Sequence, residues 1–144
     1  METKADIVQD WLPRYTATPL DGFGEYILLT NFINYVKVFA EMHDVEIIGI
    51  DKPMQTATTK GVTIINFGMG SAMAATVMDL LSAVKPKAVL FLGKCGGLKK
   101  TVVGDFILPI AAIRGEGTSN DYLPAEIPAL PSCRLQRAVS SLIK

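Results

Sequence analysis

Runs of apolar residues along the chain are spaced in two ways, one typical of strands and one typical of helices. Short runs of strand length, rich in β-branched and aromatic residues, lie at residues 26–30, 45–51, 54–59, 62–67 and 88–92. The run at 54–59 alternates polar and apolar residues, which predicts an exposed hairpin strand. The run at 88–92 is the most apolar and predicts a strand that is buried on both faces. A longer run at 104–113 contains Pro109, which predicts a strand with a bend or a sheet edge.

Segments with helical spacing separate these runs. The pattern predicts helices at residues 4–12, 32–43, 72–84 and 132–144. Asn31 and Ser71 precede two of these helices and are predicted to cap them. Because strands alternate with helices, the sequence predicts an α/β fold with a central mixed sheet. We divide the chain into an N-terminal segment, residues 1–24, and the N-terminal part of a single domain, residues 25–144.

Bulk composition restricts the classes of function. The chain has 144 residues, of which 49% are hydrophobic and 19% charged, so it can bury a core and is not an intrinsically disordered chain. Fourteen basic residues balance fourteen acidic ones. Because no net charge attracts nucleic acid or an anionic membrane, neither is an expected partner.

The cysteines and the N-terminal residues indicate in which cellular compartment the protein is expected. Cys95 and Cys133 have no spacing typical of a metal site or a disulfide framework. We therefore expect reduced thiols, no bound metal and a cytoplasmic protein. The first residues are charged and lack the apolar segment of a signal peptide, and no run approaches the roughly 18 apolar residues that a membrane span needs.

Three glycine-containing turns follow predicted strands and carry the candidate chemistry. They come after Phe67, Leu92 and Ile113. In open α/β sheets, ligands bind beyond the carboxyl ends of the strands. The three turns therefore predict one composite site.

Common motifs do not account for these turns. The segment Gly68-Met69-Gly70 opens a helix, but a dinucleotide fingerprint requires glycine or alanine where Met73 stands, and the P-loop pattern is absent from the sequence.

His43 is the single histidine and lies at a predicted helix C-terminus, where it interacts favourably with the helix dipole. No base accompanies Cys95 in the sequence pattern, so a packed thiol is favoured over a nucleophile. We expect no cofactor.

Lys94 opens the second of these turns and is followed by Cys95, Gly96 and Gly97. A lysine at a strand end, beside exposed backbone N–H groups, favours binding of an anion, most naturally a phosphate. A solvated loop lysine is the alternative.

The third turn holds Arg114, Glu116, Gly117, Thr118 and Ser119. A cation, a carboxylate and two hydroxyls on a flexible backbone suit a polyhydroxylated, charged ligand such as a sugar phosphate. A polar turn with a surface Arg–Glu pair is the alternative.

In their order, these segments resemble the nucleoside phosphorylase and nucleosidase superfamily. Its members share a strand followed by GMG and a helix, a strand ending in G-x-C/A-G, and a G-D segment leading into a strand; FGMGSAMAA, LGKCGGL and VGDFILPIAAIRGEGTS match in that order. The match spans about residues 25–144, and GKCGG with RGEGTSNDYLP is most similar to AMP nucleosidases of the short bacterial type. The resemblance implies a three-layer α/β/α fold, AMP as the small-molecule substrate, and a homo-oligomer in the full-length form.

Departures from the superfamily pattern bear on the reaction. Where phosphorylases carry a Gly-Asp-Pro segment followed by an arginine that binds phosphate, this chain has Asn31-Phe32-Ile33, and the resemblance places Tyr35 at that arginine. A second arginine of phosphorylases is replaced by Phe91. The resemblance then implies water as the nucleophile, with Lys94 holding the 5′-phosphate of the nucleotide together with Arg114 or a neighbouring subunit.

The family mechanism requires two carboxylates that the matched segments do not contain. An aspartate protonates N7 of the leaving adenine, and a glutamate in an M-E motif holds the ribose 2′-hydroxyl; the resemblance places both beyond Lys144. We do not assign that role to Met1-Glu2-Thr3, which lies at the N-terminus. The sequence is thus interpreted as the first part of an AMP-hydrolysing N-glycosidase, inactive by itself. The alternatives are another nucleosidase or phosphorylase of the superfamily, or an inactive fragment that binds ligand or oligomerises.

Overall fold

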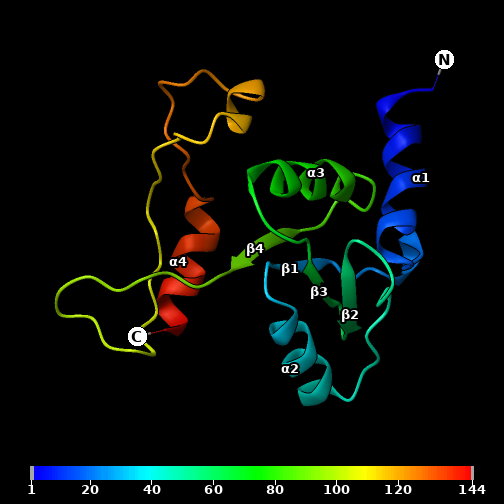
Figure 1. The fold of residues 1–144 in the computed structure, drawn as a ribbon, viewed down its shortest axis with the longest axis horizontal. Helices are drawn as coiled ribbons and strands as arrows, with labels where there is room; N and C mark the ends of the chain where they lie inside the picture. Colours follow the sequence, from blue (N-terminus) through cyan, green and yellow to red (C-terminus); the bar gives the residue numbers. More distant parts are fainter. Residues whose placement is uncertain (1, 144) are drawn as a thin grey trace. The chain divides into compact units, whose positions relative to one another are not determined.

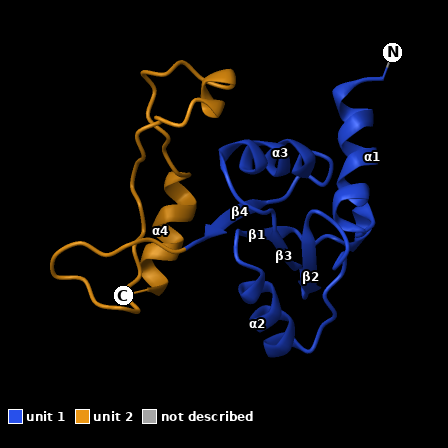
Figure 2. Cartoon of the chain, viewed as in Figure 1, with its two compact units in different colours: residues 1–93 blue, residues 94–144 orange. Residues whose placement is uncertain are grey.

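The structure, a computed structural model, describes residues 2–143. The chain forms two compact units, residues 1–93 and residues 94–144, which are coloured separately in Figure 2. The first unit carries the sheet and three α-helices, and the second carries an irregular segment, a short 3-10 helix and one α-helix.

A four-stranded sheet forms the centre of the first unit (Figure 1). Its strands are β1 (Tyr26–Thr30), β2 (Gln55–Thr59), β3 (Val62–Asn66) and β4 (Ala88–Leu92), in the order β2-β3-β1-β4. β1 pairs in parallel with β3 and β4, while β2 pairs antiparallel with β3. The predicted α/β class with a mixed sheet is therefore confirmed.

Helices cover both faces of this sheet. Helix α2 (Ile33–His43) packs Val36 and Ala40 against Ala57 and Ile64 of the sheet. Helices α1 (Lys4–Thr16) and α3 (Ser71–Leu81) cover the other face, where the core cluster includes Leu12, Val77, Leu81, Ile27 and Ile65. Burial of these side chains stabilises the three-layer arrangement that the resemblance implies.

Helix α1 is longer than the sequence predicted. It begins after Thr3, whose side chain accepts a hydrogen bond from the Asp6 backbone while the Asp6 carboxylate accepts one from Thr3. It continues through Pro13 to Thr16, and a 3-10 turn, η1 (Leu20–Gly22), then leads to β1. The predicted end at residue 12 was wrong because the helix packs against α3 and its C-terminal turn is buried at Leu12 and Thr16.

Two predicted strands do not form. Residues 45–51 make only an isolated bridge between Ile48 and Thr56, and residues 104–113 make only one between Ala112 and Ala129. An apolar run becomes a strand only when a neighbouring strand accepts its backbone hydrogen bonds. Within the range the structure describes, no strand pairs with 104–113, and Pro109 also lacks an N–H to donate.

Strand β4 lies at the edge of the sheet, although its composition predicted burial on both faces. It pairs with β1 alone, and Leu90 and Phe91 are 37% and 58% exposed. A continuous apolar run indicates the capacity for burial, but burial itself depends on neighbours that other segments must supply.

Both predicted helix caps were wrong by one residue. The N-cap of α2 is Phe32, and the N-cap of α3 is Gly70, neither with a side-chain capping bond. Gly70 has φ of +98°, a conformation that favours glycine and that turns the chain sharply into the helix. Ser71 is consequently the first helical residue.

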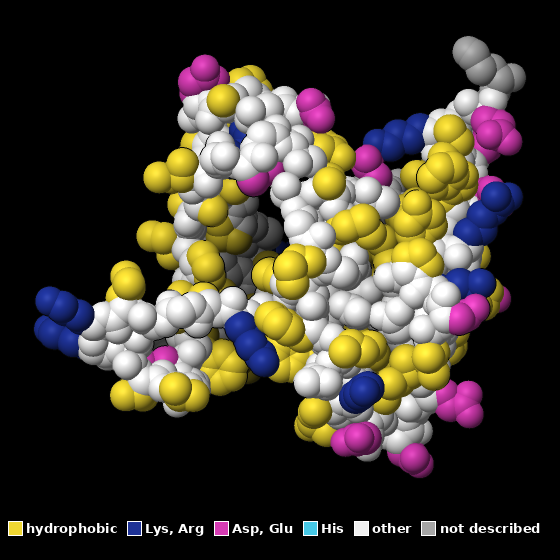
Figure 3. Space-filling model, viewed as in Figure 1, with side chains coloured by type: hydrophobic (Ala, Val, Ile, Leu, Met, Phe, Trp, Pro, Cys, Tyr) yellow, Lys and Arg dark blue, Asp and Glu magenta, His cyan; other side chains and the backbone are white. Residues whose placement is uncertain are grey.

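The second unit has little regular structure. A 3-10 turn, η2 (Thr118–Asp121), and helix α4 (Cys133–Leu142) are its only helices within the described range, and Ser132 caps α4. None of residues 94–143 is buried, and apolar side chains such as Val103, Ile113 and Leu98 are almost fully exposed. Figure 3 shows hydrophobic side chains at the surface of the molecule. Polar contacts rather than a hydrophobic core therefore hold this unit together.

Gly24→Ala is expected to destabilise the first unit by about 1–3 kcal/mol, the usual cost of overpacking. An added Cβ would lie 2.3 Å from the backbone of Gly61, whose carbonyl accepts the hydrogen bond that starts β1. Urea denaturation followed by fluorescence of Trp11 measures the change. Gly115→Ala, where an added Cβ meets nothing within 4 Å, is the control. An unchanged midpoint for Gly24→Ala would contradict this close approach.

Candidate functional site

The three parallel strands of the first unit end at the same edge of the sheet. In the register of these strands, Thr30 of β1 pairs with Asn66 of β3 and with Leu92 of β4. Two of the predicted turns, after Phe67 and after Leu92, therefore follow parallel strands at their carboxyl ends, as expected. The third turn, after Ile113, follows no strand, and that part of the prediction was wrong.

The turn between β3 and α3 presents a helix N-terminus at this edge. Gly70 caps α3 without a side-chain bond, and an added Cβ at Gly68 or Gly70 would meet nothing within 4 Å. The first N–H groups of a helix have no partner within the helix and carry partial positive charge. This geometry is compatible with polar or anionic groups of a ligand.

Asn31, which the sequence predicts as a helix cap, lies directly after β1. Its Oδ1 atom is buried and has no hydrogen-bond partner within the described residues. Leaving a buried acceptor unpaired costs about 1–3 kcal/mol. An asparagine directly after a strand end is the sequence signal for such a polar group at the carboxyl edge of the sheet.

Two aromatic residues, at positions where the resemblance places the phosphate-binding arginines of phosphorylases, belong to the first unit. Tyr35 lies in the first turn of α2, is half-buried, and meets Phe32 edge-on with ring centroids 5.8 Å apart. Phe91 lies in β4, with its ring 5.9 Å from that of the buried Phe67. Aromatic rings at these positions provide apolar contact area and no positive charge.

The turn that begins with Lys94 opens the second unit. Lys94, Cys95, Gly96 and Gly97 are all exposed and belong to no helix or strand. Both cysteines, Cys95 and Cys133, are free thiols, as the sequence predicted. Lys94 follows the carboxyl end of β4 in the chain, and its role as an anion ligand stays a prediction.

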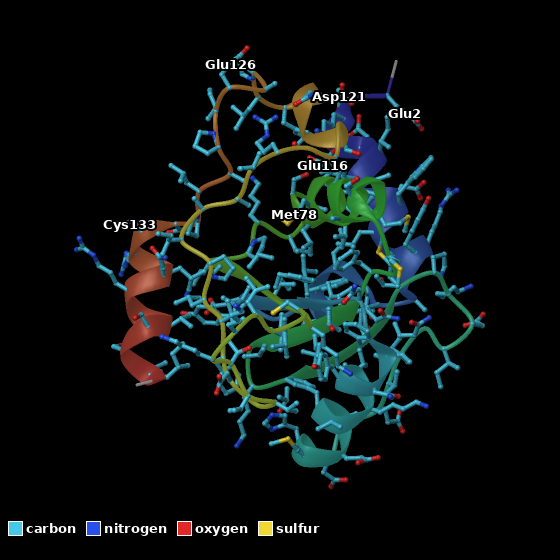
Figure 4. The ribbon with its side chains drawn as sticks, turned by 60° about the vertical axis from the view of Figure 1, so that its left-hand side comes forward. Glu2, Met78, Glu116, Asp121, Glu126 and Cys133 are labelled. Carbon is cyan, nitrogen blue, oxygen red and sulfur yellow. The ribbon has the colours of Figure 1, made fainter. Side chains whose placement is uncertain are left out.

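Arg114 and Glu116 are joined through Ser119. The Arg114 Nε donates to Ser119 Oγ at 2.9 Å, and Ser119 Oγ donates to a Glu116 carboxylate oxygen. The Ser119 backbone N–H also donates to Glu116, at 3.3 Å. Gly117, with φ of +93°, caps the short helix that begins at Thr118. Figure 4 shows Glu116 and Asp121 at this helical turn, with Glu126 farther along the chain.

Groups with shifted pKa values lie elsewhere in the part of the chain that is described. A hydrogen bond and an ion pair with Glu25, at 2.7 Å, raise the pKa of Lys87 before β4. Hydrogen bonds from the Thr3 backbone and side chain lower the pKa of Asp6 in α1. Both support local structure, at the amino end of β4 and the start of α1.

His43 is the last residue of α2, as predicted, with its ring 4.7 Å from that of Phe39. No group of three or more His, Cys, Asp or Glu side chains among residues 2–143 is arranged to hold a metal ion. Nor is any helix in that range long and apolar enough to cross a membrane.

The motifs in these turns agree with a known family. A family model described as the phosphorylase superfamily matches residues 25–143. This chain belongs to the phosphorylase superfamily. The resemblance inferred from FGMGSAMAA, LGKCGGL and RGEGTS is therefore confirmed.

Within the superfamily, the chain is similar to AMP nucleosidases. The crystal structure of AMP nucleosidase from Bacteroides thetaiotaomicron VPI-5482 is 63% identical in sequence, superposes with a TM-score of 0.92, and is matched over 97% of this chain and 60% of that chain. AMP nucleosidase from Escherichia coli K12 is 27% identical over 171 residues, covering 92% of this chain and 35% of the relative.

Phosphorylases of the superfamily share the fold at lower identity. A uridine phosphorylase from Vibrio fischeri ES114 superposes with a TM-score of 0.76 at 22% identity, matched over 85% of this chain and 53% of that chain. The chain thus spans a little over half the length of these solved relatives and about a third of the Escherichia coli enzyme.

Proposed function

We propose that this chain carries the substrate-binding part of an N-glycosidase that hydrolyses AMP to adenine and ribose 5-phosphate. The observation that supports this most is the similarity to an AMP nucleosidase, 63% identical over 97% of the chain. The reaction needs no cofactor. The family resemblance supports a homo-oligomer as the working form, and the free cysteines support a cytoplasmic location.

The site residues are proposed to bind different parts of AMP. Lys94 holds the 5′-phosphate, beside the exposed backbone of Cys95, Gly96 and Gly97. Glu116 and Thr118 face hydroxyl or amino groups, supported by Ser119 and the glycine conformation at Gly117. Tyr35 provides an apolar wall with a hydroxyl for hydrogen bonding.

Hydrolysis breaks the bond between C1′ and N9 and forms a bond between C1′ and the oxygen of water. The purine leaves with its proton on N7, and water gives up a proton. The ribose ring gains positive charge in the transition state, so a carboxylate beside it is most stabilising at that point. We propose that the leaving-group acid and the ribose-holding glutamate come from the part of the fold that the relatives carry beyond the matched residues.

The absence of charge at Tyr35 and Phe91 favours water over phosphate as the nucleophile. A phosphorylase must bind inorganic phosphate beside C1′, and a phosphate is held most strongly by arginine through paired hydrogen bonds. Two aromatic rings provide no such donors. Phosphorolysis is the second candidate because the phosphorylases share the fold.

Product analysis tests this assignment. The chain is fused to the remaining segment of the Bacteroides thetaiotaomicron AMP nucleosidase and incubated with AMP in water enriched in oxygen-18, with and without inorganic phosphate. We expect adenine and ribose 5-phosphate with the label at C1′, at a rate that phosphate does not raise. A second phosphate on C1′ of the sugar would identify a phosphorylase instead, and cleavage of adenosine or uridine in preference to AMP would overturn the substrate assignment.

A further inference from the structure

All the nitrogen atoms of the Arg114 guanidinium donate to groups of the same loop. Nη1 donates to the carbonyl oxygens of Pro124 and Ile127 at 2.6 and 3.0 Å. Nη2 donates to the carbonyl of Leu123 at 2.7 Å and also contacts the carbonyl of Ser119 and Oδ1 of Asn120. With Nε on Ser119 Oγ at 2.9 Å, the five N–H groups of the guanidinium are occupied.

These acceptors belong to a loop that closes on itself. Ala112 and Ala129 exchange two backbone hydrogen bonds, 2.9 and 3.0 Å long, and join the two ends of the segment. The residues between them include exposed Ile113 and Tyr122, and none is buried. Since no apolar core orders the loop, the half-buried Arg114 is its main internal cross-link.

The same guanidinium is connected to the Glu116 carboxylate through the Ser119 hydroxyl. By donating to Ser119 Oγ, Arg114 leaves the Ser119 hydroxyl proton directed at Glu116. The Ser119 N–H adds a second donor to that carboxylate. A chain of donors that runs from a cation to a carboxylate polarises each bond in turn.

We infer that Arg114 is a positioning residue that builds the 112–129 loop and sets the Glu116 carboxylate, and that it is not a ligand of the substrate phosphate. Its donors would have to leave several carbonyl oxygens of the loop before they could bind an anion, and the loop would then lose the hydrogen bonds that cross-link it. The part of this inference that concerns AMP rests on the proposed function. The part that concerns the loop does not.

Hydrogen exchange, measured by mass spectrometry on the full 144-residue chain, tests the loop. Arg114→Gln and Arg114→Lys are both expected to speed exchange of the loop amides, including those of Leu123 and Ala129, by about tenfold or more, since local protection follows local stability. The strands of the first unit should exchange unchanged. Arg137→Gln, at an exposed arginine of α4, is the control and should leave the loop unchanged.

Lysine keeps the charge but has a single nitrogen, which cannot span carbonyl oxygens on both sides of the loop. If Arg114→Lys retained the protection of the parent chain, charge alone would order the loop and the inference would fail. A parent loop without measurable protection would overturn it as well.

Measurements of ligand affinity distinguish a positioning role of Arg114 from direct contact with the phosphate. Titration calorimetry with AMP and with adenosine is expected to show that Arg114→Gln weakens both by the same factor, and that Ser119→Ala does so to a smaller extent. A loss confined to AMP would make Arg114 a phosphate ligand and overturn the inference. If the parent chain binds neither compound, the proposed function loses its support, while the exchange measurement still decides the role of Arg114 in the loop.

Discussion

The 144-residue chain, assayed by itself, is expected to release no adenine from AMP, whereas its fusion to the remaining segment of the Bacteroides thetaiotaomicron relative is expected to be active. Proton transfer to the leaving base and stabilisation of the charged ribose each contribute factors of about 10²–10⁴. Losing both lowers the rate by at least about 10⁴-fold. Chromatographic measurement of free adenine over several hours detects this difference.

The matched control for that experiment is the remaining segment of the relative without this chain. It should be inactive too, because it lacks the turns at the carboxyl ends of β3 and β4 and the Lys94 segment. Adenine release by the 144-residue chain alone would show that it contains its own leaving-group acid. An inactive fusion that is folded and binds AMP would favour the alternative of an inactive ligand-binding chain.

Lys94→Met is expected to lower kcat/KM for AMP by about 10- to 100-fold in the fusion protein and to leave adenosine cleavage nearly unchanged. The loss corresponds to one charge-assisted hydrogen bond, about 1.5–3 kcal/mol. The two substrates differ only in the 5′-phosphate, so the ratio of their kcat/KM values isolates the contact. Methionine retains most of the length of the lysine side chain without its charge.

Lys99→Met, at an exposed lysine a few residues farther on, controls for a general effect of positive charge on a dianionic substrate. It should change the ratio by less than about twofold, as expected for a distant charge screened by salt. Equal losses for AMP and adenosine in Lys94→Met would remove the 5′-phosphate role from this residue. They would then point to a structural effect on the turn.

The spacing of apolar residues was sufficient to predict several helices and strands. The runs at 26–30 and 88–92 coincide with β1 and β4, and the amphipathic face with Val36 and Ala40 predicted α2. The alternating run at 54–59 forms β2, which begins at Gln55 and pairs antiparallel with β3, but its predicted exposure was wrong because Thr56 and Ala57 are fully buried. Side-chain periodicity is a property of the sequence, so these elements could be predicted without a partner.

Segments whose state depends on distant partners were predicted less well. Residues 45–51 and 104–113 have the composition of strands, but only single bridges form there. The location of β4 at the edge of the sheet also depends on which strands pair. Pairing brings together segments that are far apart in the sequence. Composition cannot supply that information.

For the candidate site, the sequence by itself determined which residues follow the strands, the family motifs and the aromatic replacements at Tyr35 and Phe91. Only the tertiary structure decided that Asn31 Oδ1 is buried with no hydrogen-bond partner among the described residues, and that Arg114 donates to loop carbonyls. Residue type specifies how many hydrogen bonds a side chain can make, whereas the folded backbone determines which acceptors lie within reach.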